Sequence, residues 1–138
     1  MSFENSLAVG VGQLLAAQSV GVWSTSFGST DTAIVFGDLP AAPTKAIGLT
    51  PYPLRDDGNT GLVVLGLQVF MRAQTLAAVM DLRDAVRNVL HNRRNYSVGG
   101  VPVSRSWRQM ASPQGPDSSN FQRVADSYYF LTGRQVLY

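Results

Sequence analysis

The amino-acid sequence predicts an α+β fold, a mixed and mainly antiparallel β-sheet with two main helices packed on it. The first reason is the order of the hydrophobic patterns along the chain, which run as helix, strands, helix, strands. The second reason is the length of 138 residues, which is typical of one domain with its own core. No internal repeat or change of composition marks a boundary, so we expect a single domain over residues 1–138.

The first helix is expected over residues 4–19. Its apolar residues recur at helical spacing, at Leu7, Val11, Leu14 and Leu15. Gly10 and Gly12 interrupt the pattern, and a glycine inside a helix costs roughly 1 kcal/mol relative to alanine. The next segment, Val22 to Asp31, is rich in glycine, serine and threonine and is expected to be a loop.

Three strands are expected in the middle of the chain, at residues 32–36, 45–50 and 61–72. We expect the second strand to end at Pro51-Tyr52-Pro53, and the polar residues 55–59 predict a turn before the third. One face of the third strand is apolar throughout, with Val63, Leu65, Leu67, Val69 and Met71. Its other face is apolar only at the start, which predicts a central strand that is buried on both sides at its beginning and then leaves the core.

The second helix is expected over residues 75–91, with Thr75 as its N-cap. Its apolar stripe consists of Val79, Leu82, Val86, Val89 and Leu90. On its surface we expect Asp81 and Asp84 to form ion pairs with the helical arginines Arg83 and Arg87. Two more strands, at residues 101–111 and 120–132, are expected to flank a polar loop from Ser112 to Ser119.

The residues needed for catalysis or for metal binding are scarce. Cysteine is absent, which excludes thiolate nucleophiles and sulfur-bound zinc. His91 is the only histidine, so we expect no metal site with several histidines. It is predicted at the end of a helix, where we expect it to act as a partial cation near the last carbonyls and not as the base of a Ser-His-Asp triad. We therefore expect no catalytic residue, no cofactor and no metal. No apolar run approaches the roughly 20 residues that span a bilayer, so no membrane partner is expected.

Arginine and aromatic residues point instead to contacts between proteins. Ten of the eleven basic residues are arginine, which coding bias in a GC-rich genome would explain, and which is also typical of protein interfaces. The run Tyr128-Tyr129-Phe130 must place rings on both faces of a strand, and the face outside the core then needs a helix or another chain to cover it. The predicted interface residues are Arg55, Asp56, Asp57, Arg93, Arg94, Arg105, Trp107, Arg108, Phe121 and Arg123.

The order of several segments resembles a known family. These segments are the run from Thr32 to Pro40 (TAIVFGDLP) followed by Pro43, the run from Ala46 to Pro53 (AIGLTPYP), Asp56-Asp57, the strand from Gly66 to Arg72 (GLQVFMR), and the helix end Val89-Leu90-His91. Over roughly residues 30–95 they resemble the tail terminator, or minor capsid, proteins of the head–tail neck of long-tailed bacteriophages (siphoviruses).

The resemblance implies a structural protein of the virion without enzymatic activity. It implies a homo-oligomeric ring, usually a hexamer, at the head-proximal end of the tail tube, assembled in the host cytoplasm. The implied partners are the tail tube protein and a head-completion or connector protein, and the viral DNA would pass through the lumen without specific binding. Another head–tail connector, a tail tube subunit, and a small-ligand enzyme with a pocket built without histidine pairs or cysteine remain as alternatives.

Overall fold

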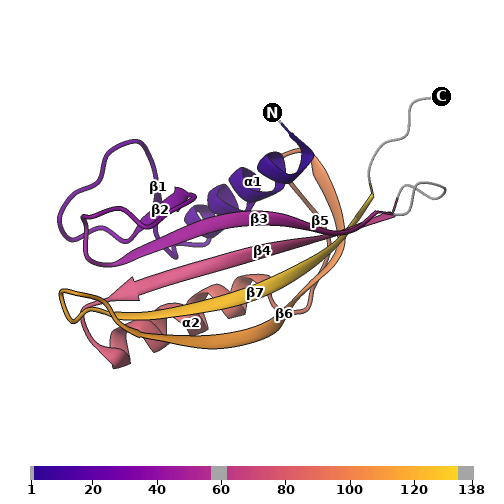
Figure 1. Ribbon diagram of the computed structural model, residues 1–138. Coiled ribbons are helices and arrows are strands. Elements are labelled where there is room, and N and C mark those ends of the chain that lie inside the picture. Colours follow the sequence, from indigo (N-terminus) through magenta and orange to yellow (C-terminus); the bar gives the residue numbers. More distant parts are fainter. Residues whose placement is uncertain (1, 57–61, 134–138) are drawn as a thin grey trace.

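The fold is built on one curled β-sheet (Figure 1). This computed structural model describes residues 2–56 and 62–133. Its elements are α1 (Phe3–Ala17), β1 (Val22–Trp23), β2 (Ala33–Phe36), β3 (Ala46–Asp56), β4 (Leu62–Ala73), α2 (Leu76–Leu90), β5 (Arg93–Val98), β6 (Val101–Pro116) and β7 (Gln122–Gly133). The strand order among these residues is β1-β2-β3-β4-β7-β6-β5, with the β1–β2 and β2–β3 pairs parallel and the others antiparallel. The predicted fold class is confirmed.

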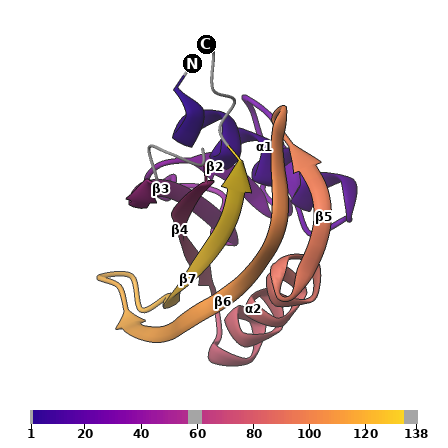
Figure 2. The ribbon, with the colours of Figure 1, turned by 90° about the vertical axis from the view of Figure 1, so that its right-hand side faces the viewer.

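Both helices pack on one face of the sheet, here called the inner face, and the sheet curls around them (Figure 2). Helix α1 contributes the buried residues Leu7, Val11 and Leu15, and α2 contributes Val79, Leu82, Val86 and Leu90. These side chains meet the apolar side of β4, on which Val63, Leu65, Leu67, Val69 and Met71 are at most 5% exposed. The stripes predicted from helical and strand spacing therefore form one continuous core, and burial of their apolar area is the main stabilising term.

Side-chain caps fix the beginnings of both helices. The Thr75 hydroxyl accepts a hydrogen bond of 3.1 Å from the amide of Ala78, as predicted, and the Ser2 hydroxyl accepts one of 3.1 Å from the amide of Asn5. Each bond satisfies an amide that has no partner inside its own helix.

The glycines of α1 mark places where other parts of the chain approach the helix closely. A Cβ added at Gly10 would lie 2.5 Å from the carbonyl carbon of Val98 and closer still to the amide nitrogen of Gly99, so the helix backbone touches the turn between β5 and β6. At Gly12 the added Cβ would meet the ring of Trp23. The helix tolerates the low propensity of glycine because this packing needs the missing side chains.

Strand β3 continues through both prolines, so the expected end at Pro51-Tyr52-Pro53 is wrong. The carbonyls of Lys45 and Leu49 accept hydrogen bonds from amides of β2 and of the residue that follows it. The odd-numbered residues of β3 therefore direct their backbone N–H and C=O groups toward the β2 side of the strand. β2 pairs with β3 only as far as Leu49, so Pro51 and Pro53 face an edge without a neighbouring strand. A proline loses no ladder hydrogen bond there, and it hinders edge-to-edge pairing.

The C-terminal third contains more strand than the sequence predicts. β5 occupies Arg93–Val98, where no strand was expected, and β6 continues to Pro116. The expected loop from Ser112 to Ser119 is therefore wrong, because residues 112–116 belong to β6, which pairs with β7, and only residues 117–121 form the turn. The β6–β7 ladder has three register shifts, and the one between Pro113 and Gly115 lies within this segment. A two-residue strand, β1, also lies within the segment that was expected to be a loop.

The even-numbered face of β4 was expected to be buried at the start of the strand and exposed at its end, and this prediction is wrong. Val64 near its start is only half-buried, whereas Arg72 at its end is buried. The Arg72 guanidinium donates hydrogen bonds to the carbonyl oxygens of Pro40, Pro43 and Thr44 at 2.6 to 2.8 Å. These bonds explain the burial of its charge, because they replace water around the guanidinium.

Candidate functional site

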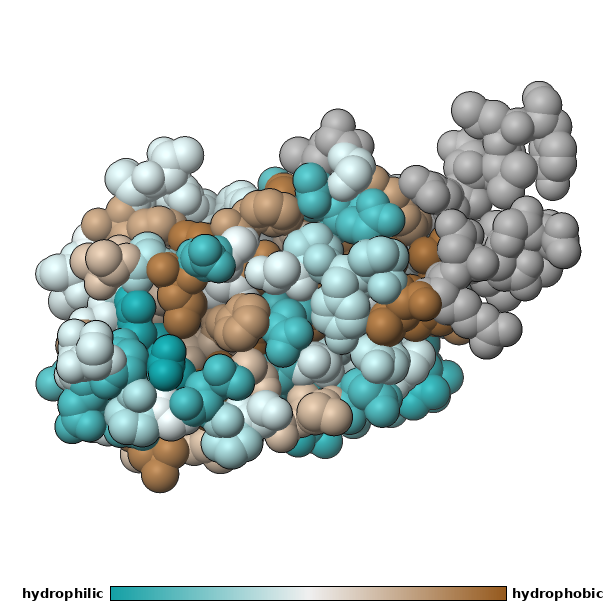
Figure 3. All heavy atoms as spheres, viewed as in Figure 1, coloured by the Kyte–Doolittle hydropathy of each residue, from teal (hydrophilic) through white to brown (hydrophobic). Residues whose placement is uncertain are grey.

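The face of the sheet opposite the helices, here called the outer face, is covered by no helix of the described chain (Figures 1 and 2). The β4–β7 ladder assigns the even-numbered residues from Val64 to Arg72 and the odd-numbered residues from Arg123 to Leu131 to this face, since their neighbours point into the core. Hydrophobic and hydrophilic side chains alternate over it (Figure 3). Exposed sheet faces of this kind are candidates for contact with other chains.

Three aromatic rings cross the outer face in one row. The register places Tyr52 opposite Gly66, Gly66 opposite Tyr129, and Tyr129 opposite Trp107. The Tyr52 ring lies over Gly66, because a Cβ added there would come within 2.7 Å of its Cε1 atom. Trp107 and Tyr129 pack edge to face, with ring centroids 5.9 Å apart. All three rings are half-buried, so this aromatic row (Tyr52, Tyr129 and Trp107) keeps apolar surface available.

Arginines adjoin the aromatic row at the Trp107 end. Arg105 stacks over the Trp107 ring at 5.0 Å, and Arg94 on β5 lies directly opposite Arg105. Two like charges facing each other across a ladder repel. None of the described outer-face side chains is a carboxylate, so nothing there neutralises this pair. The outer face thus combines aromatic surface with positive charge, as protein interfaces often do.

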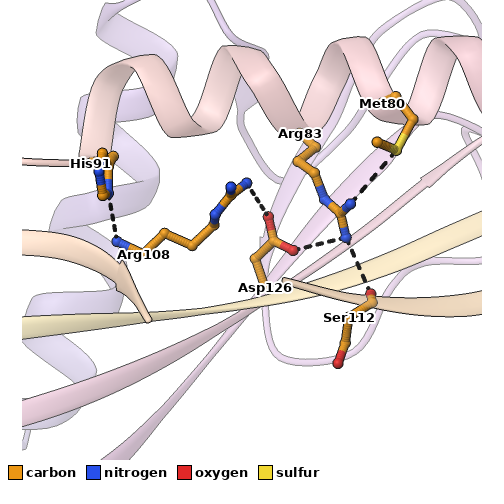
Figure 4. Close-up of polar contacts among 6 residues, drawn as sticks. All are labelled: Met80, Arg83, His91, Arg108, Ser112 and Asp126. Atoms are coloured by element: carbon orange, nitrogen blue, oxygen red, sulfur yellow. Dashed lines mark hydrogen bonds and ion pairs between the residues drawn. The ribbon is translucent and has the colours of Figure 1, made fainter. Parts of the chain in front are cut away.

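A second group of charges lies on the inner side, between α2 and the sheet (Figure 4). The Asp126 side chain is fully buried, with Oδ1 3.0 Å from the Arg83 guanidinium and Oδ2 3.7 Å from that of Arg108. Arg83 also donates to the carbonyl oxygen of Ser112 at 3.2 Å. Burial raises the pKa of Asp126, and the two arginines oppose that rise. This group joins α2 to β6 and β7 and is internal to the chain, because its charges are paired with each other.

The arrangement corrects two predictions about α2. Arg83 pairs with Asp126 instead of with Asp81 or Asp84, which are exposed. His91 does not act as a cation near helix carbonyls, since its Nδ1 accepts a hydrogen bond of 3.0 Å from the amide of Arg108. Desolvation and the neighbouring positive charges of Arg87, Arg108 and Arg105 lower the pKa of His91 below its ordinary value of 6.5. The β5–β6 ladder ends at Ser106, so the edge of β6 has no neighbouring strand of the described chain after that residue. There His91 accepts a hydrogen bond from a backbone amide of β6, and Arg83 donates one to a backbone carbonyl of β6.

The predicted interface residues separate into groups. Arg94, Arg105 and Trp107 come together on the outer face. Arg108 points inward to Asp126, and the guanidinium of Arg93 lies 5.0 Å from the Tyr96 ring on its own strand. Phe121 is the last residue of the β6–β7 turn, and Arg123 lies beside the turn, where its guanidinium donates hydrogen bonds to the carbonyls of Gly115 and Pro116. Arg55 and Asp56 belong to β3 without a described side-chain position, and Asp57 lies outside the described residues.

Tyr52 and Met110 on the outer face were not among the predicted interface residues. Tyr52 was missed because the strand was expected to end there, and Met110, which is 60% exposed, was missed because the residue lies beyond a register shift. The ring of Tyr129 was expected outside the core, and the structure places it there while Tyr128 and Phe130 are buried. In the described residues no group of three or more His, Asp or Glu side chains could hold a metal ion. No helix of residues 2–56 or 62–133 is long and apolar enough to cross a membrane.

Comparisons with known proteins agree with this architecture. Residues 14–131 match the family model described as bacteriophage tail terminator protein. A chain from the structure entitled "Virion of native gene transfer agent (GTA) particle" superposes with a TM-score of 0.62 at 14% identity, over 96% of this chain and 99% of that one. A second solved chain has a TM-score of 0.59 at 13% identity, over 99% of both chains. At these identities the structural matches establish the shared fold, and no curated protein matches in sequence.

Proposed function

The chain belongs to the bacteriophage tail terminator protein family, and from this premise we propose that it forms the ring that ends the tail tube. Membership makes it a structural, non-enzymatic protein of the phage particle. In our proposal the ring is a homohexamer at the head-proximal end of the tail, in the neck. It stops polymerisation of the tube and offers the surface to which the filled head docks. The observation that carries this proposal is the family match, which extends over residues 14–131.

The outer face supports a role in assembly. An aromatic row and an unneutralised arginine pair on a helix-free sheet are residue types that anchor protein contacts. A closed ring repeats one contact around its axis, and each subunit contributes two different patches to that contact, so the outer face would supply one of the two. We propose that Arg94, Arg105 and Trp107 belong to subunit contacts. The tail tube protein and a head-completion protein are the proposed partners on the two sides of the ring, and the viral DNA passes through its lumen without specific binding.

The β6–β7 turn is the proposed docking element for a neck partner. Its backbone is ordered by Asp117, whose Oδ1 accepts hydrogen bonds of 2.9 Å from the amides of Ser119 and Phe121. Phe121 is the last residue of this turn, and Arg123 lies beside the turn on β7. Replacing residues 117–121 by Asn-Gly should leave melting within a few degrees and impair the joining of tails to heads. Normal joining would remove the turn from the docking surface.

The function is tested by adding the purified protein to tail tube protein during polymerisation. We expect shorter tubes, each closed at one end by one extra ring in negative-stain images. Filaments of this protein alone would identify a tube subunit instead, and binding to heads without binding to tube ends would identify a head-completion protein. Either result would overturn the proposal.

A further inference from the structure

We propose that the outer face of one copy binds the exposed face of α2 in the next copy, so that subunits associate head to tail. This inference rests on the proposed ring and names its contact surfaces. The outer-face side of the contact consists of Arg94, Arg105, Trp107, Tyr129 and Met110. The α2 side consists of Leu76, Met80, Asp81 and Asp84.

The exposed face of α2 has apolar surface that no element of the described residues covers. Leu76 is 61% exposed and Met80 is 39% exposed. Positions 76, 80 and 84 are spaced four apart, so they form one row on the helix, on the side away from the buried Val79, Leu82 and Val86. Exposed leucine and methionine beside each other on a helix are typical of a docking face.

The charges of the two surfaces are complementary. Asp81 and Asp84 are exposed on α2, and both ion pairs of the described residues involve Asp126 instead. Arg94 and Arg105 face each other on the outer face without a carboxylate. Association of the two surfaces would therefore pair two unused carboxylates with two guanidiniums that repel each other in the free subunit. The apolar parts also match, because Met110 and the aromatic row can cover Leu76 and Met80.

The positions of the two surfaces suit a head-to-tail contact. The outer face is the side of the sheet opposite α2 (Figure 2), so one copy can contact two neighbouring copies at the same time, one through each surface. An interface made from two different patches generates a ring when its rotation closes. Binding of DNA to the outer face is less favoured, because a net charge of +2 for the chain gives little gain from counterion release.

Charge reversal tests the contact. We expect Arg94→Glu/Arg105→Glu and Asp81→Arg/Asp84→Arg each to lower the ring fraction at least tenfold in native mass spectrometry, with and without tube protein. Combining the four substitutions should restore rings, because the charges are exchanged. Lys45→Glu and Asp38→Arg serve as control variants, because they reverse exposed charges outside the proposed contact, and both should form rings normally. The four side chains of the contact are exposed as well, so every variant should keep the thermal melting of the wild type.

Disulfide trapping gives an independent measurement. The chain has no cysteine, so Met80→Cys and Met110→Cys proteins each carry one thiol. When the two proteins are mixed in equal amounts and oxidised, we expect mainly the mixed disulfide, which joins position 80 of one copy to position 110 of the other. Under the same conditions, either protein alone should stay monomeric in non-reducing gels. Rings that persist in both charge-reversed variants, or a mixture without the mixed disulfide, would overturn this contact and leave the proposed ring intact.

Two further results would also overturn it. If the wild-type protein neither closes into rings nor binds tube ends, the proposed function fails and the contact with it. If Arg94→Glu/Arg105→Glu forms normal rings but loses binding to double-stranded DNA that the wild type retains, the outer face is a nucleic-acid surface.

Discussion

Replacing Gly10 by alanine sets two physical effects against each other. Alanine in the middle of a helix is favoured over glycine by roughly 1 kcal/mol, so propensity alone predicts a more stable protein. However, the new Cβ would lie 2.5 Å from the carbonyl carbon of Val98 and 2.9 Å from the Cα of Gly99. Ordinary contacts of this kind lie near ~3.5 Å or beyond, and both neighbours are backbone atoms of a turn, which cannot rotate away.

The clash should decide the outcome. Relief requires α1 to move by about 1 Å from the sheet, which would loosen the packing of Leu7 and Val11, both fully buried. Overpacking of this kind typically costs about 1–3 kcal/mol, and more where backbone must shift. After subtracting the gain in propensity, we expect Gly10→Ala to destabilise the protein by about 1–2 kcal/mol, or a fall in Tm of roughly 3–10 °C.

Urea unfolding followed by circular dichroism measures this difference, with two control variants in the same helix. Gln13→Ala, at an exposed position, should be neutral or slightly stabilising, because only propensity acts there. Gly12→Ala should cost less than Gly10→Ala, because it meets the Trp23 ring, a side chain that can turn aside. A Gly10→Ala protein as stable as the wild type would refute the close contact between α1 and the β5–β6 turn.

Three other changes test the core and the charges under α2. Leu82→Asp should unfold the chain, because an unpaired buried carboxylate costs several kcal/mol of a total of about 5–15, and a native circular dichroism spectrum would contradict the packing of α2. Asp126→Asn should lower the free energy of unfolding by about 3 kcal/mol, since it leaves Arg83 and Arg108 without their carboxylate, whereas an unchanged urea midpoint would show that the group is not structural. The lowered pKa of His91 means that the unfolded chain binds its proton more readily, so its stabilising contribution is present above pH 6.5 and lost as the pH falls through the lowered pKa. The stability difference between wild type and His91→Asn should therefore shrink on acidification, and a constant difference would contradict the hydrogen bond to Arg108.

Sequence patterns were reliable where one physical signal dominated. The stripe from Val79 to Leu90, the Thr75 cap and the apolar side of β4 were predicted because burial alone sets their spacing. Pro51 and Pro53 led to a wrong prediction of the end of β3. A proline interrupts a strand only where a neighbouring strand would need its amide hydrogen, and the sequence alone does not show which side of the strand a residue's backbone groups face. β5 was missed because alternation over Arg93–Val98 is weak, and its existence depends on its pairing with β6.

The site was predictable in kind and less so in position. Arg105 and Trp107, which were predicted as interface residues, lie together in the structure, and the run Tyr128-Tyr129-Phe130 correctly predicted a ring outside the core. Arg108 was misassigned because the register shift between Val103 and Arg105, with another after Arg108, decides which side chains of β6 turn inward. Tyr52 joins the aromatic row through pairing with a residue far away in the sequence, which alternation within one strand cannot reveal.

Electron cryo-microscopy of the intact tail end tests the central claim most directly. We expect one closed ring of this chain at the head-proximal end of the tube, absent from the rest of the tube, with the outer face of each subunit against α2 of the next. Copies repeated along the tube, or a single copy at the neck, would contradict it.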